Sequence, residues 1–215
     1  RREKVGEMQR QDPDSRIWNR FAEGLDFLLG NPNSNLRNEE LYIPLLQSLI
    51  DSPFASAEEK EKAVHDLPLF KLNRVGQKAA DFPFRLMNGR TSSLYAIESG
   101  YTILFFSNPG CPACREIMET LASLPDFDQL IEDKSLAVAN IYPDEDLAAW
   151  REYASIYPKN WYNGYDEYQT IYNTPLYHIR AIPSVYLLDS EKKVILKDAP
   201  TELLVSVLSQ LLYGE

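Results

Sequence analysis

Cys111 and Cys114 are the two cysteines of the chain, and they stand in the stretch Cys-Pro-Ala-Cys. Two cysteines placed at random would fall three apart roughly one time in a hundred, and this spacing is typical of redox-active disulfides. A helix is predicted to begin at the pair, and the free N–H groups of a helix N-terminus favour a thiolate. We therefore expect Cys111 to be the exposed nucleophile and Cys114 the buried thiol that resolves a mixed disulfide. Pro112 suits the first helical position, where its missing N–H costs nothing.

Three other interpretations of the cysteine pair remain open at this point. A purely structural disulfide would close so short a loop that it would stabilise the fold little. A structural zinc site needs four ligands, and the other soft ligands are His65 and His178, which lie far apart without finger-like spacing. The third possibility is a pair of buried, unreactive thiols. We predict no metal site.

Strands alternating with helices are predicted on both sides of the pair. Residues 101–106 form a continuous apolar run of β-branched and aromatic residues, which favours a strand buried on both faces. Asn108-Pro109-Gly110 breaks this run directly before Cys111. Similar patterns predict strands over residues 82–86, 91–94, 136–141, 184–188 and 193–197, and helices from the cysteine pair to residue 124, over 144–157, around 167–173 and over 200–213. Such an order implies an α/β fold with a sheet covered by helices.

The first third of the chain has a different pattern. Residues 1–13 are polar and end in proline, so we expect a flexible arm. Apolar residues then recur at helical spacing over 17–29, 41–50 and 56–67, and Ser56 with Glu59 forms a capping box for the third helix. We divide the chain into the arm (1–13), a small all-helical domain (14–74) and an α/β domain (75–215) with an aromatic-rich insertion at about 158–178.

Nine tryptophans and tyrosines gather in this insertion and in the helix before it. They could line a groove for a peptide, because aromatic side chains are enriched at binding surfaces. Packing against the sheet would explain the same residues, since several of them follow helical spacing. They are Trp150, Tyr153, Tyr157, Trp161, Tyr162, Tyr165, Tyr168, Tyr172 and Tyr177.

The order of the motifs resembles the thioredoxin-like superfamily, and within it the TlpA/ResA-like thiol-disulfide oxidoreductases. The resemblance covers about residues 75–215 and is carried by the stretches 76–82, 86–91, 103–114 and 181–189. It implies a thioredoxin-like sheet flanked by helices. It also implies that Pro183, in Ala-Ile-Pro-Ser, is a cis-proline beside Cys111, and that the backbone of Ile182 is free to pair with a substrate strand. Ile182, Pro183 and Pro112 are thus the predicted substrate-binding residues.

The sequence departs from this family pattern around the cysteines. Gly110 stands where a tryptophan usually precedes the first cysteine, and Phe105 stands where thioredoxins carry a buried acid. Relatives often carry a glutamate three residues after the second cysteine, where this chain has Ile117. Glu116 precedes it on another face of the helix. A group that takes the proton of Cys114 is therefore missing at the expected positions.

Composition excludes several classes of partner and cofactor. The net charge of −10 and the pI of about 4.8 disfavour nucleic acid, which needs a basic surface. No apolar run approaches the roughly 20 residues of a membrane span. A Gly-x-Gly-x-x-Gly fingerprint is absent, so we expect no nicotinamide or flavin and no cofactor besides the redox-active disulfide.

Residues 33–42 and 73–76 resemble a helical domain of unknown function that precedes thioredoxin-like domains in exported proteins, often lipoproteins, of Gram-negative bacteria. We therefore expect a location in the periplasm or cell envelope. The chain begins at Arg1 rather than at methionine, so we expect that an upstream segment was removed or left out, with a lipid anchor as one option.

The leading functional hypothesis is an exported oxidoreductase that reduces protein disulfides through the Cys-x-x-Cys (CXXC) pair. Its partners would be client proteins with disulfides and an upstream thiol donor that reduces the pair again. The sequence leaves a disulfide oxidant or isomerase open, because Pro112 and Ala113 do not fix the direction. If the protein is not an enzyme, the alternative is a non-catalytic module that binds a partner on a thioredoxin scaffold.

Overall fold

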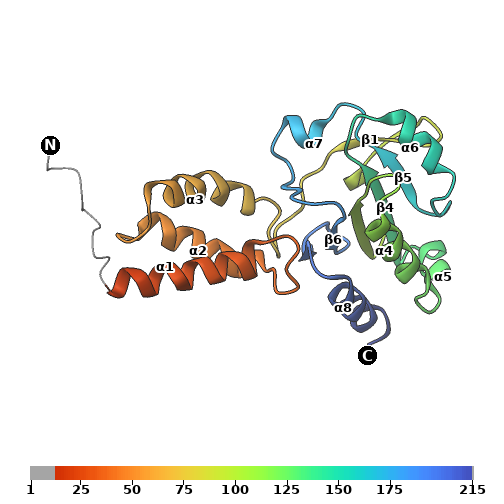
Figure 1. Cartoon of the computed structure of the whole chain (residues 1–215). Coiled ribbons are helices and arrows are strands. Elements are labelled where there is room, and N and C mark those ends of the chain that lie inside the picture. The colour runs from red at the N-terminus through yellow and green to blue at the C-terminus, as the bar shows by residue number, and fades with distance from the viewer. Residues whose placement is uncertain (1–12, 215) are drawn as a thin grey trace, which may run out of the picture. The chain divides into compact units, whose positions relative to one another are not determined.

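The computed structural model describes residues 13–214, which divide into two compact units (Figure 1). The first unit ends at Phe70 and the second begins at Lys71, whereas the sequence placed the boundary after residue 74. Asn73 belongs to the second unit because its side-chain amide donates to the carbonyl of Leu176 at 2.6 Å and accepts from the N–H of Ala80 at 2.8 Å. The arm predicted over residues 1–13 lies, up to residue 12, outside the described residues.

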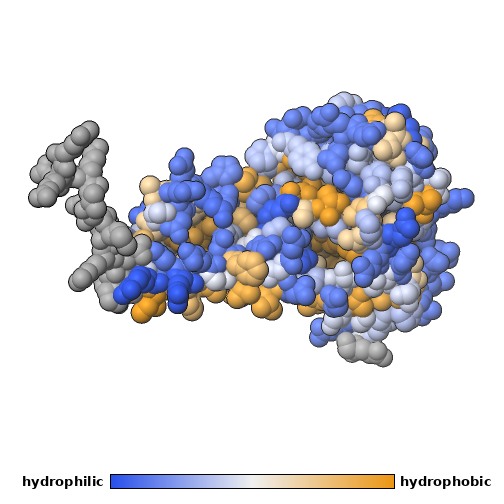
Figure 2. Space-filling model, viewed as in Figure 1, coloured by the Kyte–Doolittle hydropathy of each residue, from blue (hydrophilic) through white to orange (hydrophobic). Residues whose placement is uncertain are grey.

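The first unit is helical, with a core around Tyr42 and Phe70, whose ring centroids are 4.8 Å apart. The predicted capping box is confirmed, because the Glu59 N–H donates to Ser56 Oγ at 3.2 Å and the Ser56 N–H donates to Glu59 Oε2 at 2.7 Å. Figure 2 shows apolar side chains on the surface of this unit. Its elements are α1 (Pro13–Leu25), a π-helical turn (Asp26–Gly30), α2 (Glu39–Asp51) and α3 (Ala57–Phe70).

The second unit is built on a seven-stranded sheet in the order β2-β1-β5-β4-β3-β6-β7. Strands β3, β4 and β5 are parallel to one another, and β6 is antiparallel to β3. The strands are β1 (Pro83–Leu86), β2 (Thr91–Ser93), β3 (Tyr101–Phe106), β4 (Leu136–Tyr142), β5 (Tyr162–Tyr165), β6 (Ser184–Leu188) and β7 (Val194–Lys197). The helices are α4 (Pro112–Ala122), α5 (Phe127–Glu132), α6 (Leu147–Ala154), α7 (Thr170–Asn173) and α8 (Thr201–Tyr213), and a short 3-10 helix covers Leu94–Ala96.

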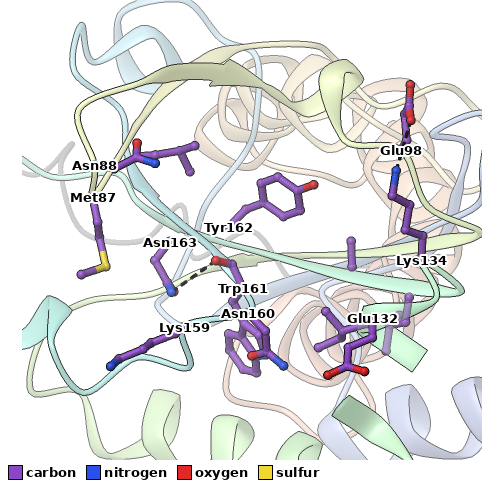
Figure 3. Close-up of a pocket in the computed structure, with 14 residues that line it drawn as sticks. Met87, Asn88, Glu98, Glu132, Lys134, Lys159, Asn160, Trp161, Tyr162 and Asn163 are labelled. Atoms are coloured by element: carbon purple, nitrogen blue, oxygen red, sulfur yellow. Dashed lines mark hydrogen bonds and ion pairs between the residues drawn. The ribbon is translucent and has the colours of Figure 1, made fainter. Parts of the chain in front are cut away.

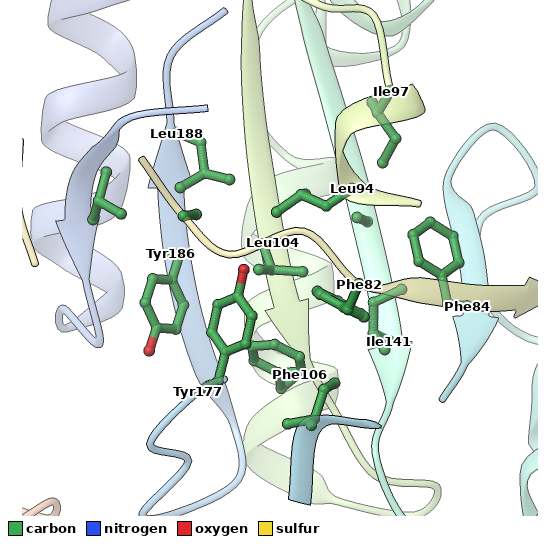
Figure 4. Close-up of a cluster of buried hydrophobic side chains, with 14 of the residues drawn as sticks. Phe82, Phe84, Leu94, Ile97, Leu104, Phe106, Ile141, Tyr177, Tyr186 and Leu188 are labelled. Carbon is green, nitrogen blue, oxygen red and sulfur yellow. The ribbon is translucent and has the colours of Figure 1, made fainter. Parts of the chain in front are cut away.

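The two faces of this sheet bury separate apolar clusters, because successive side chains of β3 point to opposite faces. Leu104 and Phe106 point into one cluster, which the aromatic rings of Phe82, Tyr177 and Tyr186 fill (Figure 4). Ile103 and Phe105 belong to the other cluster, which residues of α4 and α8 cover. The prediction that residues 101–106 are buried on both faces is confirmed, because Ile103 to Phe106 have no exposed surface.

The aromatic-rich segment is not the appended insertion that the sequence suggested. It contains β5, which pairs with β4 on one side and with β1 on the other, inside the sheet. The stretch Tyr-Asn-Gly-Tyr is four residues long and has no β-branched residue, so it carried little strand signal. Gly164 is required there, because a Cβ at this position would lie 2.7 Å from Cδ2 of Phe84.

Candidate active site

The topology brings two loops together at one end of the sheet. Phe106, the last residue of β3, pairs with Ser184, the first residue of β6. The loop that follows β3 and leads to Cys111 therefore begins beside the end of the loop that carries Ile182 and Pro183. Cys111 and Ile182 both pack, partly buried, against the same apolar cluster. The structure thus brings the predicted catalytic and substrate-binding residues into one region.

Cys111 and Cys114 are joined in a disulfide, and their Cα atoms are 5.2 Å apart. Cys111 is the N-cap residue of α4, and its Sγ accepts a hydrogen bond from the N–H of Cys114 at 3.2 Å. Cys111 is partly exposed and Cys114 is 2% exposed. Pro112 is exposed at the start of the helix. A redox-active disulfide and a structural disulfide remain as the two interpretations of this pair.

The surroundings of Cys114 are apolar. Phe105, at the position where thioredoxins carry an acid, is fully buried in the same cluster as Cys114, and Ile117 lies there as well. Glu116 is exposed to solvent on α4. Burial among apolar groups disfavours a thiolate, so in the reduced protein we expect Cys114 to remain a thiol while Cys111 ionises.

The Ile182–Pro183 peptide bond is cis in the structure. Both residues are partly exposed, directly before β6. The loop before them is tied down by Arg180, whose guanidinium forms a salt bridge with Asp198 at 3.1 Å. This pair is largely buried, and the Asp198 N–H also donates to the carbonyl of Val185 at 2.8 Å.

On its other side the loop of residues 107–111, the redox loop, is held by Asp144, which the sequence did not assign to the site. It also lies against Tyr153, one of the nine aromatic residues predicted either to line a groove or to pack. The side-chain amide of Asn108 donates to Asp144 Oδ2 at 2.9 Å, and the N–H of Cys111 donates to the carbonyl of Asn108 at 3.3 Å. Asp144 also interacts with Tyr172, and partial burial together with this carboxylate raises the pKa of Tyr172 to about 12. The hydroxyl of Tyr153 lies against Gly110.

A chain of buried polar side chains lies behind the redox loop. Ser107 donates to Asn140 Oδ1, Asn140 donates to Asn163 Oδ1 at 3.0 Å, and Asn163 donates to the carbonyl of Pro158 at 2.7 Å. Tyr157 reaches Ser107 as well, and burial raises the pKa of its phenol. Because each of these groups is paired, the first residue of the loop is fixed to β4 and β5.

The aromatic residues of the segment divide into two groups. Packing accounts for the buried ones, which are Trp150, Tyr157, Trp161, Tyr165 and Tyr177. Tyr168 and Tyr172 are exposed on the surface, and Tyr153 and Tyr162 are partly buried.

Figure 3 draws residues that line a hollow of about 580 Å³. This hollow lies at the opposite end of the sheet from the disulfide. Leu136 and Ala137, which begin β4, line it, whereas Cys111 follows the end of the parallel strand β3. Lys134 and Glu98 form an exposed ion pair at its edge, 3.5 Å apart. This hollow is therefore separate from the redox site.

Within residues 13–214 no three His, Cys, Asp or Glu side chains are grouped so that they could hold a metal ion. No helix in the same range has the length and apolarity needed to cross a membrane.

Comparison with known proteins identifies the family. A family model described as thioredoxin-like matches residues 99–194. A thioredoxin-like protein from Bacteroides caccae has a similar structure with a TM-score of 0.85 and 43% sequence identity, over 91% of this chain and 70% of that chain. The C-terminal domain of an uncharacterized protein from Bacteroides fragilis is also 43% identical, with a TM-score of 0.60, over 64% of this chain and 98% of that one.

The chain therefore belongs to the thioredoxin-like family. The 91% coverage exceeds what residues 71–215 can supply, so the match with the Bacteroides caccae protein extends into the helical unit. A thioredoxin domain of a thiol-disulfide oxidoreductase from Bacteroides vulgatus shares the fold, with 18% identity and a TM-score of 0.55 over 64% of this chain and 97% of that domain. Comparison with curated proteins gives no match.

Proposed function

We propose that the protein is an exported thiol-disulfide oxidoreductase that reduces disulfides of client proteins through Cys111 and Cys114. The observation that carries this proposal is the disulfide at the N-terminus of α4, with one partly exposed and one buried sulfur. A helix N-terminus stabilises a thiolate at its first cysteine, and burial holds the second as a thiol. A purely structural disulfide would require neither arrangement.

The reaction consists of two thiol-disulfide exchanges. The thiolate of Cys111 attacks one sulfur of the client disulfide, which forms a mixed disulfide and releases the other client sulfur as a thiolate. Cys114 then loses its proton to solvent or to the released thiolate and attacks the sulfur of Cys111. The second client thiol leaves and the Cys111–Cys114 disulfide forms. The client gains two electrons and the pair loses two, so an upstream dithiol must reduce the pair again.

Pro112, Ile182 and Pro183 form the client-binding surface in this proposal. Pro112 is exposed, Ile182 and Pro183 are partly exposed, and Ile182 packs against the same apolar cluster as Cys111, which supports the proposal. The backbone of Ile182 would pair with an extended client segment. The redox-active disulfide serves as the only redox centre. We further propose a location in the periplasm or cell envelope.

The first experiment is an equilibrium redox titration of the full chain against dithiothreitol or glutathione, followed by thiol labelling. A midpoint near about −270 mV is expected for a reductant, and a midpoint near about −120 mV would make the protein an oxidant. If the pair does not exchange at all, the proposal fails and a non-catalytic binding module replaces it.

Two matched variants test the roles of the sulfurs. Cys114→Ser keeps the nucleophile but removes the resolving thiol, so it should accumulate a mixed disulfide with a client peptide. Cys111→Ser should form none, because the remaining thiol is buried. Equal trapping by both variants would contradict the assignment of the nucleophile.

A further inference from the structure

The redox loop lies between two different segments of the second unit. Strand β3 has β4 on one side and β6 on the other, and β3 is parallel to β4 and antiparallel to β6. The segment after β4 and the segment before β6 are therefore at the same end of the sheet as Cys111. Ile182 and Pro183 flank the loop from the β6 side. Residues 144–154, which follow β4 and include α6, flank it from the other side.

Tyr153 is the residue of this second flank that lies against Gly110, directly before Cys111. A Cβ placed on Gly110 would lie 3.1 Å from the Tyr153 hydroxyl oxygen and 3.5 Å from its Cζ. Gly110 itself has φ +71 and is exposed. Gly110, the residue before Cys111, therefore has no side chain of its own. The phenol of Tyr153 lies beside the place where a side chain of residue 110 would begin.

The position of Tyr153 is fixed by the packing of its helix. Trp150 and Ala154 of α6 are buried in a cluster with Tyr142 and Tyr157. The ring centroids of Trp150 and of Tyr165 in β5 are 4.9 Å apart. A side chain on an element anchored in this way holds its place with little loss of entropy when a ligand binds.

The hydroxyl of Tyr153 is available to a ligand. Tyr153 is half-buried, and its hydroxyl forms no hydrogen bond with another of residues 13–214. A client polypeptide whose sulfur is bonded to Cys111 lies next to Gly110, because the two residues are adjacent and Gly110 has no side chain of its own. A backbone carbonyl of that client can then accept a hydrogen bond from the phenol. A small disulfide without an extended chain has no such carbonyl.

We infer that Tyr153 is a specificity-determining residue, whose hydroxyl donates a hydrogen bond to the backbone of the client polypeptide in the mixed disulfide. The inference rests on the proposed function, and it names the substrate class as extended polypeptides rather than small disulfides. The client is held from both flanks of the loop, by Ile182 on one side and by Tyr153 on the other.

The test measures single-turnover reactions of the reduced full chain with two disulfides. One is a peptide of about ten residues with one intramolecular disulfide, and the other is 2-hydroxyethyl disulfide. Tyr153→Phe removes the hydroxyl and keeps the ring, while Tyr168→Phe is the matched control, because Tyr168 is an exposed tyrosine of the same unit. The midpoint of the redox titration is recorded for every variant.

Tyr153→Phe should lower the second-order rate constant for the peptide by about two- to tenfold, the range of one hydrogen bond. Its rate with 2-hydroxyethyl disulfide and its redox midpoint should equal those of the wild type, and Tyr168→Phe should change none of the three. Equal slowing with both disulfides, or a shifted midpoint, would mean that the hydroxyl acts on Cys111 instead and would overturn the inference. An unchanged peptide rate would overturn it too. If the wild type reacts with neither disulfide, the proposed function itself fails.

Discussion

Replacing Gly110 by alanine tests the geometry beside the nucleophile. We expect two separate effects, each of which lowers the free energy of unfolding. The first comes from the backbone, because φ +71 lies in the left-handed region, where a residue with a Cβ is disfavoured by about 1–2 kcal/mol. The second comes from the contact with Tyr153, whose hydroxyl would lie 3.1 Å from the new methyl group, whereas ordinary contact begins at 3.4 Å. A misfit of this kind costs about 1 kcal/mol, the low end for overpacking, because Tyr153 is only half-buried.

Gly89→Ala is a matched control that separates the two costs. Gly89 has φ +79, close to that of Gly110, but a Cβ added there would have no atom of the described residues beyond its chain neighbours within 4 Å. We therefore expect Gly89→Ala to lower the free energy of unfolding by the backbone term alone. The contact term can be removed independently by Tyr153→Phe, since the nearest remaining ring atom, Cζ, lies at an ordinary 3.5 Å from the Cβ of residue 110.

The assay is urea unfolding of the oxidised full chain, followed by tryptophan fluorescence in a Trp18→Phe background. Trp150 and Trp161 then report on the second unit alone. Gly110→Ala should cost about 1 kcal/mol more than Gly89→Ala, and this excess should disappear when Tyr153→Phe is present. Equal costs for the two glycine substitutions, or an excess that persists without the hydroxyl, would refute the placement of Tyr153 against Gly110.

Two further substitutions test the fold around the site. Gly164→Ala should destabilise the second unit by about 1–3 kcal/mol in the same assay, because its Cβ would lie 2.7 Å from the buried ring of Phe84, and a neutral effect would contradict the position of β5 in the sheet. Tyr177→Phe should cost about 1 kcal/mol at pH 7 through loss of the hydrogen bond from its hydroxyl to the carbonyl of Ala80. Burial raises the pKa of Tyr177 well above 10, so above pH 10 the unfolded phenol ionises while the folded one does not, and the free energy of unfolding falls. Tyr177→Phe should make that alkaline loss smaller, and an unchanged pH dependence would contradict the burial of the phenol.

The parts of the fold that could be predicted are those with a strong local signal. The run at residues 101–106 predicted the central strand, since a strand buried on both faces must be apolar throughout. Ser56 and Glu59 predicted the start of α3, because a capping box is a contact between residues three apart. By contrast β5 depends on neighbours that lie far away in the sequence, namely β4 and β1. Its short polar stretch is a strand because those two neighbours supply its hydrogen bonds.

The same distinction explains which site residues could be found in advance. The cysteine pair has a local spacing, and Pro183 stands in a recognisable segment, so both could be named from the sequence. Asp144 and Tyr153 have no motif of their own. They contact the loop before Cys111 because β4 runs parallel to β3, so the segments that follow the two strands begin at the same end of the sheet. In this protein the residue before the nucleophile is a glycine, and the side chain beside it comes from α6. In the proposed mechanism, variation in α6 would therefore change which clients are bound while the Cys-Pro-Ala-Cys turn and its chemistry stay the same.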